Sequence, residues 1–393
     1  MLLLASGCGK KEAEVDPNAA TTSGLTGEPV RIGALVASTG TFSVAGSYHQ
    51  RTLLMVSQEL SATGVSGRPL EVIIKDTNGS PDKTVTFCKE LIDDPSVLAI
   101  LGPSTTGELL QVKPLCEEAH IPLICYASGD VILEPPTKYT FKTSPRDVHA
   151  AALLFKAMKD KGVSRIGLIT DNTGFGKMGW EMVDAMAPDY GITVVERVMF
   201  DRNATDVNEA VDKLKPLNID GILTWASVPT QGLVAKTMRQ IGMGIPVFQS
   251  HGFGNIKYVE QGGIACEGTI FPGTKVLLPN SLPEGHPQKA FLAAYKRNYE
   301  ERFGEPAMVF GTDACDALMI AVKAVELGGT DREKLRDTIE NMKGYVGAGG
   351  VFSFSPEDHN GLGPEAFDML VVRSNRFAFC KRPEKPATPA ATR

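Results

Sequence analysis

The sequence predicts an α/β protein built from two lobes, each organised around a parallel sheet. Short apolar runs bounded by Gly or Pro alternate with stretches of helical period, which is typical of buried parallel strands joined by helices. The series runs from residue 30 to residue 161 and starts again at residue 165. With 393 residues, the chain is long enough for two domains that each bury a core.

The first series carries five predicted strands. They are Val30–Val36, Leu70–Asp76, Val97–Leu101, Ile121–Tyr126 and Tyr139–Thr143. Four helices are predicted between these strands and after them. The first follows the turn 37–46 and runs to about residue 60, and the second starts at residue 80. The third and fourth run over residues 106–119 and 146–161. The triplet Ser80-Pro81-Asp82 is a typical helix start, with a cap, a proline at the first helical position and an acid in the first turn.

The second series predicts five more strands, and a segment of different character follows it. The strands are Arg165–Thr170, Thr193–Phe200, Gly221–Trp225, Val247–Gln249 and Thr269–Phe271, with helices through 176–186 and 207–214 and from residue 229. A loop with four prolines follows over residues 272–287. Two long helices are predicted next, around residues 291–299 and over residues 310–327. A third helix is predicted to residue 342, and the capping box Thr330-x-x-Glu333 marks its start. Short strands at Val351–Phe354 and Met369–Val372 end the pattern. Three helices before two strands suggest that a late segment completes the first lobe and that the chain crosses between lobes more than once.

The chain begins with what resembles the end of a bacterial lipoprotein signal. Small residues precede Cys8, which we expect to be lipidated at the mature amino terminus, although the basic region and most of the apolar core of such a signal are missing. Residues 9–28 read as a flexible tether and residues 377–393 as a disordered tail. No other run approaches the length of a membrane span. We therefore expect an extracytoplasmic domain, in the periplasm or on the cell surface, that is held at the membrane by its lipid alone.

Composition and motifs argue against several classes of protein. The net charge of −6 gives no reason to expect nucleic acid or an acidic membrane surface as partner. The sequence has no dinucleotide fingerprint, Walker loop, His-Glu-x-x-His or Gly-x-Ser-x-Gly motif, and its seven cysteines show no Cys-x-x-Cys spacing. We therefore expect no metal, no cofactor and no catalytic residue, and we favour binding over turnover. Whether any of the six cysteines after Cys8 pair is left open.

Two small polar turns follow neighbouring predicted strands. One contains Ser104, Thr105 and Thr106, and the other is Ala127-Ser128-Gly129. Open α/β sheets bind ligands at the carboxyl ends of their strands. The first turn also opens a helix, so its hydroxyls, its free N–H groups and the positive helix end could hold a carboxylate. The alternative is that Thr105 or Thr106 only caps the helix.

From residue 30 to about residue 375 the chain resembles the type I periplasmic binding proteins of the leucine/isoleucine/valine-binding family, the capture components of ABC importers. The resemblance rests on the order of Val-Arg-Ile-Gly-Ala-Leu, Ile-Leu-Gly-Pro-Ser-Thr-Thr, Ile-Pro-Leu-Ile, Thr-Ser-Pro-Arg-Asp, Phe-Gly-Lys and Phe-Gly-Thr-Asp-Ala. It implies two Rossmann-like lobes with parallel sheets, joined by a three-crossing hinge near Asp147, Thr274 and Gly347. The lobes would be residues 29–147 plus 275–347 and residues 148–274 plus 348–376. The ligand would sit between them, and ABC permease subunits would be the partner.

The resemblance also assigns site residues by position. The carboxylate-binding hydroxyl falls on Thr106, the ammonium-binding carbonyl on Ala127, and an aromatic cover from the second lobe on Phe175. The other two ammonium ligands of the family, a threonine and a glutamate, fall on Gly129 and His251, which are not comparable acceptors. A histidine can instead donate to a carboxylate or phenolic oxygen. The alternative for His251 is a structural role in a turn.

Two further stretches are similar to the branch of the family associated with aromatic acids such as benzoates and cinnamates. They are Gln-Ser-His-Gly-Phe-Gly-Asn and Phe-Ser-Pro-Glu-Asp-His-Asn-Gly-Leu. The resulting hypothesis is a lipid-anchored solute-binding protein of an ABC importer that captures a small carboxylate, with an aromatic acid favoured. The alternatives are a branched-chain amino acid as ligand, a sensory receptor domain without transport and, least favoured, an enzyme.

Overall fold

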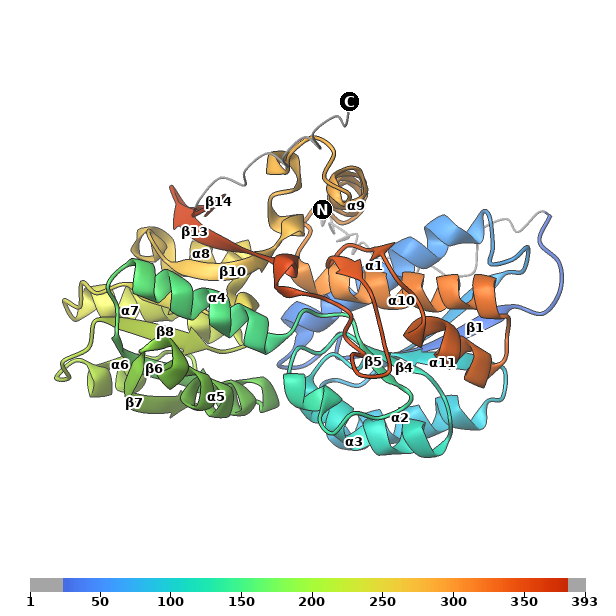
Figure 1. Cartoon of the computed structure of the whole chain (residues 1–393), viewed down its shortest axis with the longest axis horizontal. Coiled ribbons are helices and arrows are strands. Elements are labelled where there is room, and N and C mark those ends of the chain that lie inside the picture. The colour runs from blue at the N-terminus through green and yellow to red at the C-terminus, as the bar shows by residue number, and fades with distance from the viewer. Residues whose placement is uncertain (1–23, 381–393) are drawn as a thin grey trace, which may run out of the picture.

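The computed structural model describes residues 24–380, which form two lobes that lie side by side along the long axis of the molecule (Figure 1). The first lobe contains a five-stranded parallel sheet of order β2-β1-β3-β4-β5. The second contains a seven-stranded sheet of order β14-β13-β10-β9-β8-β6-β7, in which the pairs β10–β13 and β13–β14 are antiparallel and the other pairs are parallel. The fold is therefore the predicted α/β arrangement of two lobes with parallel sheets.

The first lobe is formed by the start of the chain and by helices from its last third. Its strands are β1 (Val30–Val36), β2 (Leu70–Asp76), β3 (Val97–Leu101), β4 (Leu123–Cys125) and β5 (Thr140–Lys142). Its helices are α1 (Ser43–Ser61), α2 (Pro81–Asp93), α3 (Thr106–Glu118), α9 (Lys289–Phe303), α10 (Val309–Gly328) and α11 (Arg332–Glu340), with a small ladder of β11 (Tyr345–Val346) and β12 (Val351–Phe352). As predicted, Ser80 caps α2 and accepts a hydrogen bond from the Lys83 N–H.

The second lobe is formed by the middle of the chain and its last strands. Its strands are β6 (Arg165–Asp171), β7 (Thr193–Phe200), β8 (Gly221–Trp225), β9 (Val247–Gln249), β10 (Ile270–Thr274), β13 (Phe367–Arg373) and β14 (Arg376–Phe379). Its helices are α4 (Asp147–Asp160), α5 (Gly174–Met186), α6 (Asn208–Leu214), α7 (Val234–Gln240) and α8 (Ile256–Gly262). The helix predicted from Pro229 begins as a 3₁₀ turn over Pro229–Leu233 and becomes α-helical at Val234.

The chain passes between the lobes three times, and the third crossing comes later than the sequence predicts. The first lies between β5 and α4 and the second follows β10. Residues 345–362 still pack on the first lobe, where the Phe354 ring meets Phe141 edge-on at 5.8 Å. Asn360 Nδ2 donates to the Lys142 carbonyl at 3.1 Å. The chain therefore leaves the first lobe near Gly363, not at Gly347, so residues 348–362 belong with the first lobe.

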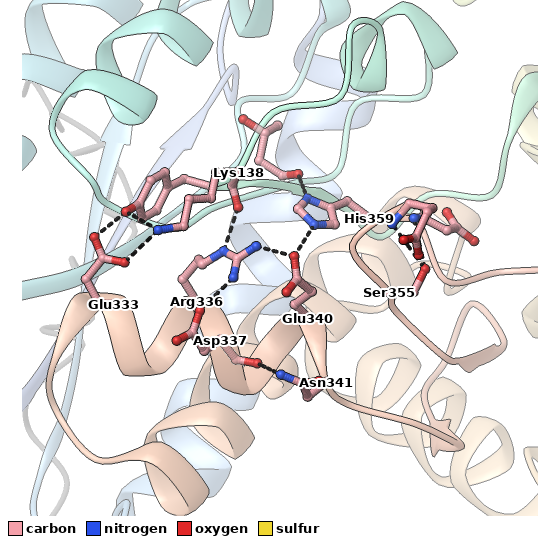
Figure 2. A network of polar contacts seen from close by, with 12 residues as sticks. Lys138, Glu333, Arg336, Asp337, Glu340, Asn341, Ser355 and His359 are labelled. Carbon is pink, nitrogen blue, oxygen red and sulfur yellow. Dashed lines mark hydrogen bonds and ion pairs between the residues drawn. The ribbon is translucent and has the colours of Figure 1, made fainter.

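A polar network explains why this late segment stays with the first lobe (Figure 2). His359 is buried, with Nδ1 2.9 Å from the Thr140 carbonyl and Nε2 3.1 Å from Glu340 Oε1. Arg336, one turn before Glu340 on α11, contacts the same carboxylate and donates through Nε to the Lys138 carbonyl at 2.9 Å. The histidine in the Asp-His-Asn-Gly stretch thus ties the late segment to β5 and α11, and it lies outside the cleft described below.

Three smaller predictions differ from the structure. Asp331, not Thr330, caps α11, because its carboxylate accepts from the Lys334 N–H at 2.9 Å. The first residues of the predicted tail form β14, which pairs with β13 and packs Phe377 and Phe379 against a hydrophobic core. The end of the predicted tether is also held, since the Thr26 N–H donates to the Gly67 carbonyl at 3.1 Å.

Two predictions concern the membrane and the cysteines. Cys8, the expected lipidation site, lies outside the described residues. Between residues 24 and 380, no helix combines the length and hydropathy that crossing a bilayer requires. The five buried cysteines in that range are free thiols (Cys88, Cys116, Cys125, Cys266 and Cys315), and the closest pair, Cys88 and Cys116, has its sulfurs 3.7 Å apart.

Candidate functional site

A cavity of about 150 Å³ lies between the two lobes. Cavities of roughly this volume hold a single benzene-sized ring, so the site suits a small ligand. Strand ends, helix starts and the first two crossings all contribute to its walls. Six of the eight predicted ligand-binding residues line it: Ser104, Thr105, Thr106, Ser128, Phe175 and His251.

The three hydroxyls of the turn before α3 have different roles. Thr105 caps α3, accepting from the Glu108 N–H at 3.3 Å and donating to Glu108 Oε2 at 2.7 Å, so its one hydrogen is used within the protein. Ser104 Oγ accepts from the Ala37 N–H at 3.0 Å and lies 2.9 Å from Nδ1 of His49. Thr106 Oγ1 accepts from the Gly129 N–H at 3.2 Å, and no other described contact uses its hydrogen. Thr106 is therefore the hydroxyl that is left to donate to a ligand oxygen.

Two predicted residues of the second turn do not line the cavity. The Ala127 carbonyl accepts a hydrogen bond from Ser144 Oγ at 2.8 Å, so it is already paired. A Cβ added at Gly129 would lie 2.8 Å from Thr106 Cγ2, which is too close for an unshifted contact. A threonine at position 129 would therefore clash with Thr106, and Gly129 contributes its backbone N–H instead.

Two helix N-termini, one from each lobe, meet at the cavity. Thr106 and Gly107 of α3 and Gly174 and Phe175 of α5 all line it. The helices approach so closely that a Cβ on Gly174 would lie 3.2 Å from the Gly107 nitrogen. Because the first N–H groups of a helix have no partner within the helix and carry partial positive charge, this arrangement favours an anion between the lobes.

The wall from the second lobe is aromatic. The ring of Phe175 lies 5.7 Å from that of Trp225, nearly parallel to it, and meets His251 edge-on at 5.4 Å. His251 follows β9, as predicted, and burial lowers its pKa to about 3, with Lys142 adding to the effect. The imidazole is therefore neutral at physiological pH and can exchange hydrogen bonds without charge.

His251 also approaches the acid at the start of α4. Its Nε2 lies 3.4 Å from Asp147 Oδ1, a distance that would suit an ion pair. Burial, followed by the charge of Asp130, raises the pKa of Asp147 well above its usual range, while the pKa of His251 is lowered. Both shifts favour the neutral forms, and burial of both side chains makes that the better description of the contact.

Among the cavity residues that sequence reasoning did not predict to bind a ligand, two titratable side chains carry an unpaired polar atom. His49 lies on α1 and Asp313 in the first turns of α10, and both are buried. No described residue makes a hydrogen bond to His49 Nε2 or to Asp313 Oδ1. His49 could have been noticed, because it shares a helix face with Thr52, Leu53 and Val56, and a polar residue on a buried face requires a partner. Asp313 carried no such signal, because α10 also buries a second acid, Asp316, and the sequence does not show which of the two faces a cavity.

The mouth of the cavity is spanned by contacts between the lobes. The guanidinium carbon of Arg202 lies 5.7 Å from the ring centroid of Phe42, a cation–π distance. Beside it, Thr41 Oγ1 lies 3.3 Å from Asn203 Oδ1. Both contacts join a loop of the first lobe to a loop after β7, so the lobes are together in this structure.

Two α/β lobes that enclose a small cavity at the carboxyl ends of their strands define a ligand-binding protein of the type I periplasmic binding fold. Comparison with known families is consistent with this class. Residues 29–375 match the family described as periplasmic binding protein, and the chain belongs to that family. The family is one of ligand-binding proteins that work outside the cytoplasm.

Similar proteins include binders of known solutes. The leucine-, isoleucine-, valine-, threonine- and alanine-binding protein of Pseudomonas aeruginosa is 23% identical over 335 residues, which are 82% of this chain and 86% of that protein. An extracellular ligand-binding receptor from Rhodopseudomonas palustris HaA2 superimposes with a TM-score of 0.84 at 22% identity, covering 90% of this chain and all of the other. The branched-chain amino acid transporter substrate-binding protein LivJ of Streptococcus pneumoniae, in complex with isoleucine, gives a TM-score of 0.78 at 20% identity, covering 89% and 98%.

Proposed function

We propose that this protein captures a small carboxylate between its lobes, with an aromatic acid favoured, and delivers it to the permease of an ABC importer. The observation that carries the proposal is the pair of helix N-termini, α3 and α5, that face one cavity from opposite lobes. Thr106 adds a hydroxyl whose hydrogen is free for a ligand oxygen. A carboxylate held by both ends would favour the closed arrangement of the lobes over an open one.

The rest of the cavity supports an aromatic ligand. Its volume of about 150 Å³ suits one ring with a carboxylate, and Phe175, Phe310 and Tyr126 supply flat apolar walls. Neither Gly129 nor a neutral His251 replaces the charged and hydroxyl acceptors that an ammonium group needs.

Asp313 favours a second candidate, a branched-chain amino acid. Its Oδ1 is buried, lines the cavity and has no described partner. Burial, with Asp316 adding, raises the pKa of Asp313 well above its usual range, so its carboxyl group is neutral at physiological pH before a ligand binds. An ammonium group placed beside it would favour the ionised form and gain a charged acceptor. A neutral Asp313 could instead donate a hydrogen bond to an aromatic acid.

Calorimetric titration separates the two candidates. Wild-type protein and Asp313→Asn are titrated with benzoate, cinnamate, leucine and isoleucine. For an aromatic acid, the asparagine amide can still donate, so the affinity should change by less than about threefold. For an amino acid, loss of the charged acceptor should weaken binding by at least about tenfold. Binding of leucine without binding of either acid would overturn the preference for an aromatic ligand.

Lipid anchoring and import are the remaining parts of the proposal. Mass spectrometry of the protein from native membranes should find a mature chain that begins at a diacylated Cys8, and an unmodified Met1 would contradict the anchor. Import predicts that genes for a permease and an ATPase lie beside this one and that their deletion abolishes ligand uptake. If uptake persists while a signalling response is lost on deletion of this gene, the sensory alternative is supported instead.

A further inference from the structure

The first-lobe side of the cavity contains a buried imidazole that is not needed to bind the proposed carboxylate. His49 projects from α1 with 1% of its surface exposed and lines the cavity. Its ring centroid lies 4.3 Å from that of Tyr126 and 6.2 Å from that of Phe310, which it meets at 89°. These aromatic neighbours remove it from water, and burial lowers its pKa to about 3, so the ring carries no charge.

One nitrogen of this ring is paired and the other is not. Nδ1 lies 2.9 Å from Ser104 Oγ, which itself accepts a hydrogen bond from the Ala37 N–H. Nε2 is buried, and no described residue makes a hydrogen bond to it. Buried polar atoms in folded proteins are almost always paired, so an unpaired nitrogen in the wall of a binding cavity points to a partner on the ligand.

The contact with Ser104 allows His49 two roles. If Ser104 donates its hydrogen to Nδ1, Nε2 carries the ring hydrogen and donates to the ligand. If Nδ1 donates to Ser104, Nε2 accepts from the ligand. A hydroxyl group can both donate and accept, so it fits either tautomer. A carboxylate has a better place at the helix ends, where partial positive charge stabilises it, than beside a neutral ring between two aromatic side chains.

We infer that His49 Nε2 binds a hydroxyl group of the ligand, and that the protein selects hydroxylated small carboxylates over their unhydroxylated counterparts. The inference rests on the proposed function, since it takes the carboxylate to be bound at α3 and α5. It makes His49 a specificity-determining residue, with Ser104 setting the orientation and tautomer of its ring.

The test uses pairs of probes that differ by one hydroxyl. Wild-type protein is titrated calorimetrically with benzoate and its 2-, 3- and 4-hydroxy derivatives, and with valine and threonine, which have nearly the same shape. We expect at least a tenfold preference for a hydroxylated member in the aromatic series or in the amino acid pair. In His49→Leu that ratio should fall towards one, and in His49→Gln, which keeps a polar amide, part of it should remain.

The design separates this inference from the proposed function. If only valine and threonine bind, the aromatic preference fails, yet their ratio still reports on His49. Equal affinities within every pair in the wild type, or a preference that persists in His49→Leu, would overturn the inference while leaving carboxylate binding intact. An equal loss for both members of a pair in His49→Leu would also overturn it, because His49 would then bind the carboxylate. His359→Gln, a buried histidine outside the cavity, is the matched control and should leave every ratio unchanged.

A second measurement covers the case in which His49→Leu does not fold. In nitrogen-15 spectra of wild-type protein, the Nε2 signal of His49 should shift on addition of the hydroxylated probe and shift less with its unhydroxylated counterpart. Identical shifts with both probes would contradict a hydroxyl contact.

Discussion

At the scale of single residues, the chemistry of the cleft depends on which polar hydrogens the protein itself uses. Thr105 donates its hydroxyl hydrogen to Glu108 Oε2. The other oxygen of Glu108 accepts hydrogen bonds from Thr84 Oγ1 at 3.0 Å and from Thr77. The alternative interpretation of the turn, that a threonine caps the helix, therefore holds for Thr105. Thr106, the next residue, points its oxygen at the Gly129 N–H and keeps its hydrogen. Of the two adjacent threonines, Thr105 therefore has a structural role, and Thr106 is the one that we propose binds the ligand.

This division predicts the effect of removing one hydroxyl. Thr106→Val keeps the shape of the side chain but removes the donor and also leaves the Gly129 N–H without its acceptor. Affinity for benzoate should fall about ten- to hundredfold, which corresponds to the roughly 1–3 kcal/mol that an unpaired buried polar group costs. Thr106→Ser retains the hydroxyl and should bind within a few-fold of the wild type. Calorimetry measures both, and undiminished binding by the valine variant would place the carboxylate elsewhere.

At the scale of elements, Asp316 on α10 holds the segment that leads to the third crossing. Its carboxylate accepts hydrogen bonds from the Ala348 and Gly349 N–H groups, both at 2.6 Å, and Gln288 Nε2 donates to the Gly347 and Ala348 carbonyls at 2.9 and 2.8 Å. The backbone of residues 347–349 is thus fixed to two helices of the first lobe. This anchoring explains why the chain does not yet cross at Gly347.

Replacing this acid tests the anchor. In Asp316→Asn, one of the two acceptor oxygens becomes an NH₂ group that faces a backbone N–H. Because one buried donor then loses its partner, the free energy of unfolding should fall by about 1–3 kcal/mol. Urea denaturation monitored by circular dichroism measures the change, and Asp212→Asn on the exposed side of α6 is a control with an expected change below about 0.5 kcal/mol. Equal stability of the two variants would show that residues 347–349 are held by Gln288 alone.

The elements also show what the sequence could and could not predict. Strands β1, β2, β3, β7, β8 and β9 have the predicted limits, because each is a short run rich in apolar residues that Gly, Pro or polar residues bound. The turn with Thr106 was found because a strand, a polar turn and a helix follow one another in sequence. His49 and Asp313 come from α1 and α10, and nothing local indicates that their helices deliver them to the same sheet edge. The late segment around His359 was misplaced for the same reason, since contacts with α11 and β5 decide its lobe.

At the scale of the whole molecule, the cavity combines two neutral imidazoles and one neutral acid, Asp313, with positive helix ends. Of the titratable groups that line the cavity, burial raises the pKa of Asp313 and lowers those of His49 and His251 to about 3. Burial also raises the pKa values of Asp147 and Asp316, which lie outside the lining. The lining also contains one carboxylate, Glu108, whose two oxygens accept hydrogen bonds from Thr77, Thr84 and Thr105 and so are already engaged within the protein. In our proposal, the helix N-termini of α3 and α5 decide the sign of the preferred ligand.

The two kinds of shift act on stability in opposite directions. An acid with a raised pKa binds more protons in the folded than in the unfolded state, so its contribution to stability increases as the pH falls through the folded pKa. A histidine with a lowered pKa is protonated more readily in the unfolded state, so acidification destabilises the fold. The pH dependence of the wild type is the sum of both effects, and a variant is needed to separate them.

His49→Gln isolates the contribution of one histidine. In the unfolded chain the imidazole has its ordinary pKa of about 6.5, whereas in the folded protein the pKa is about 3. Above pH 6.5 the neutral imidazole makes its full contribution to the free energy of unfolding. This contribution should be lost as the pH falls from 6.5 to 3, at about 1.4 kcal/mol per pH unit. Between pH 7.5 and pH 5 the wild type should thus lose about 2 kcal/mol more than His49→Gln, which has no titrating group at this position. Urea denaturation at pH 7.5, 6 and 5 gives the difference, and parallel curves for the two proteins would contradict a buried, neutral His49.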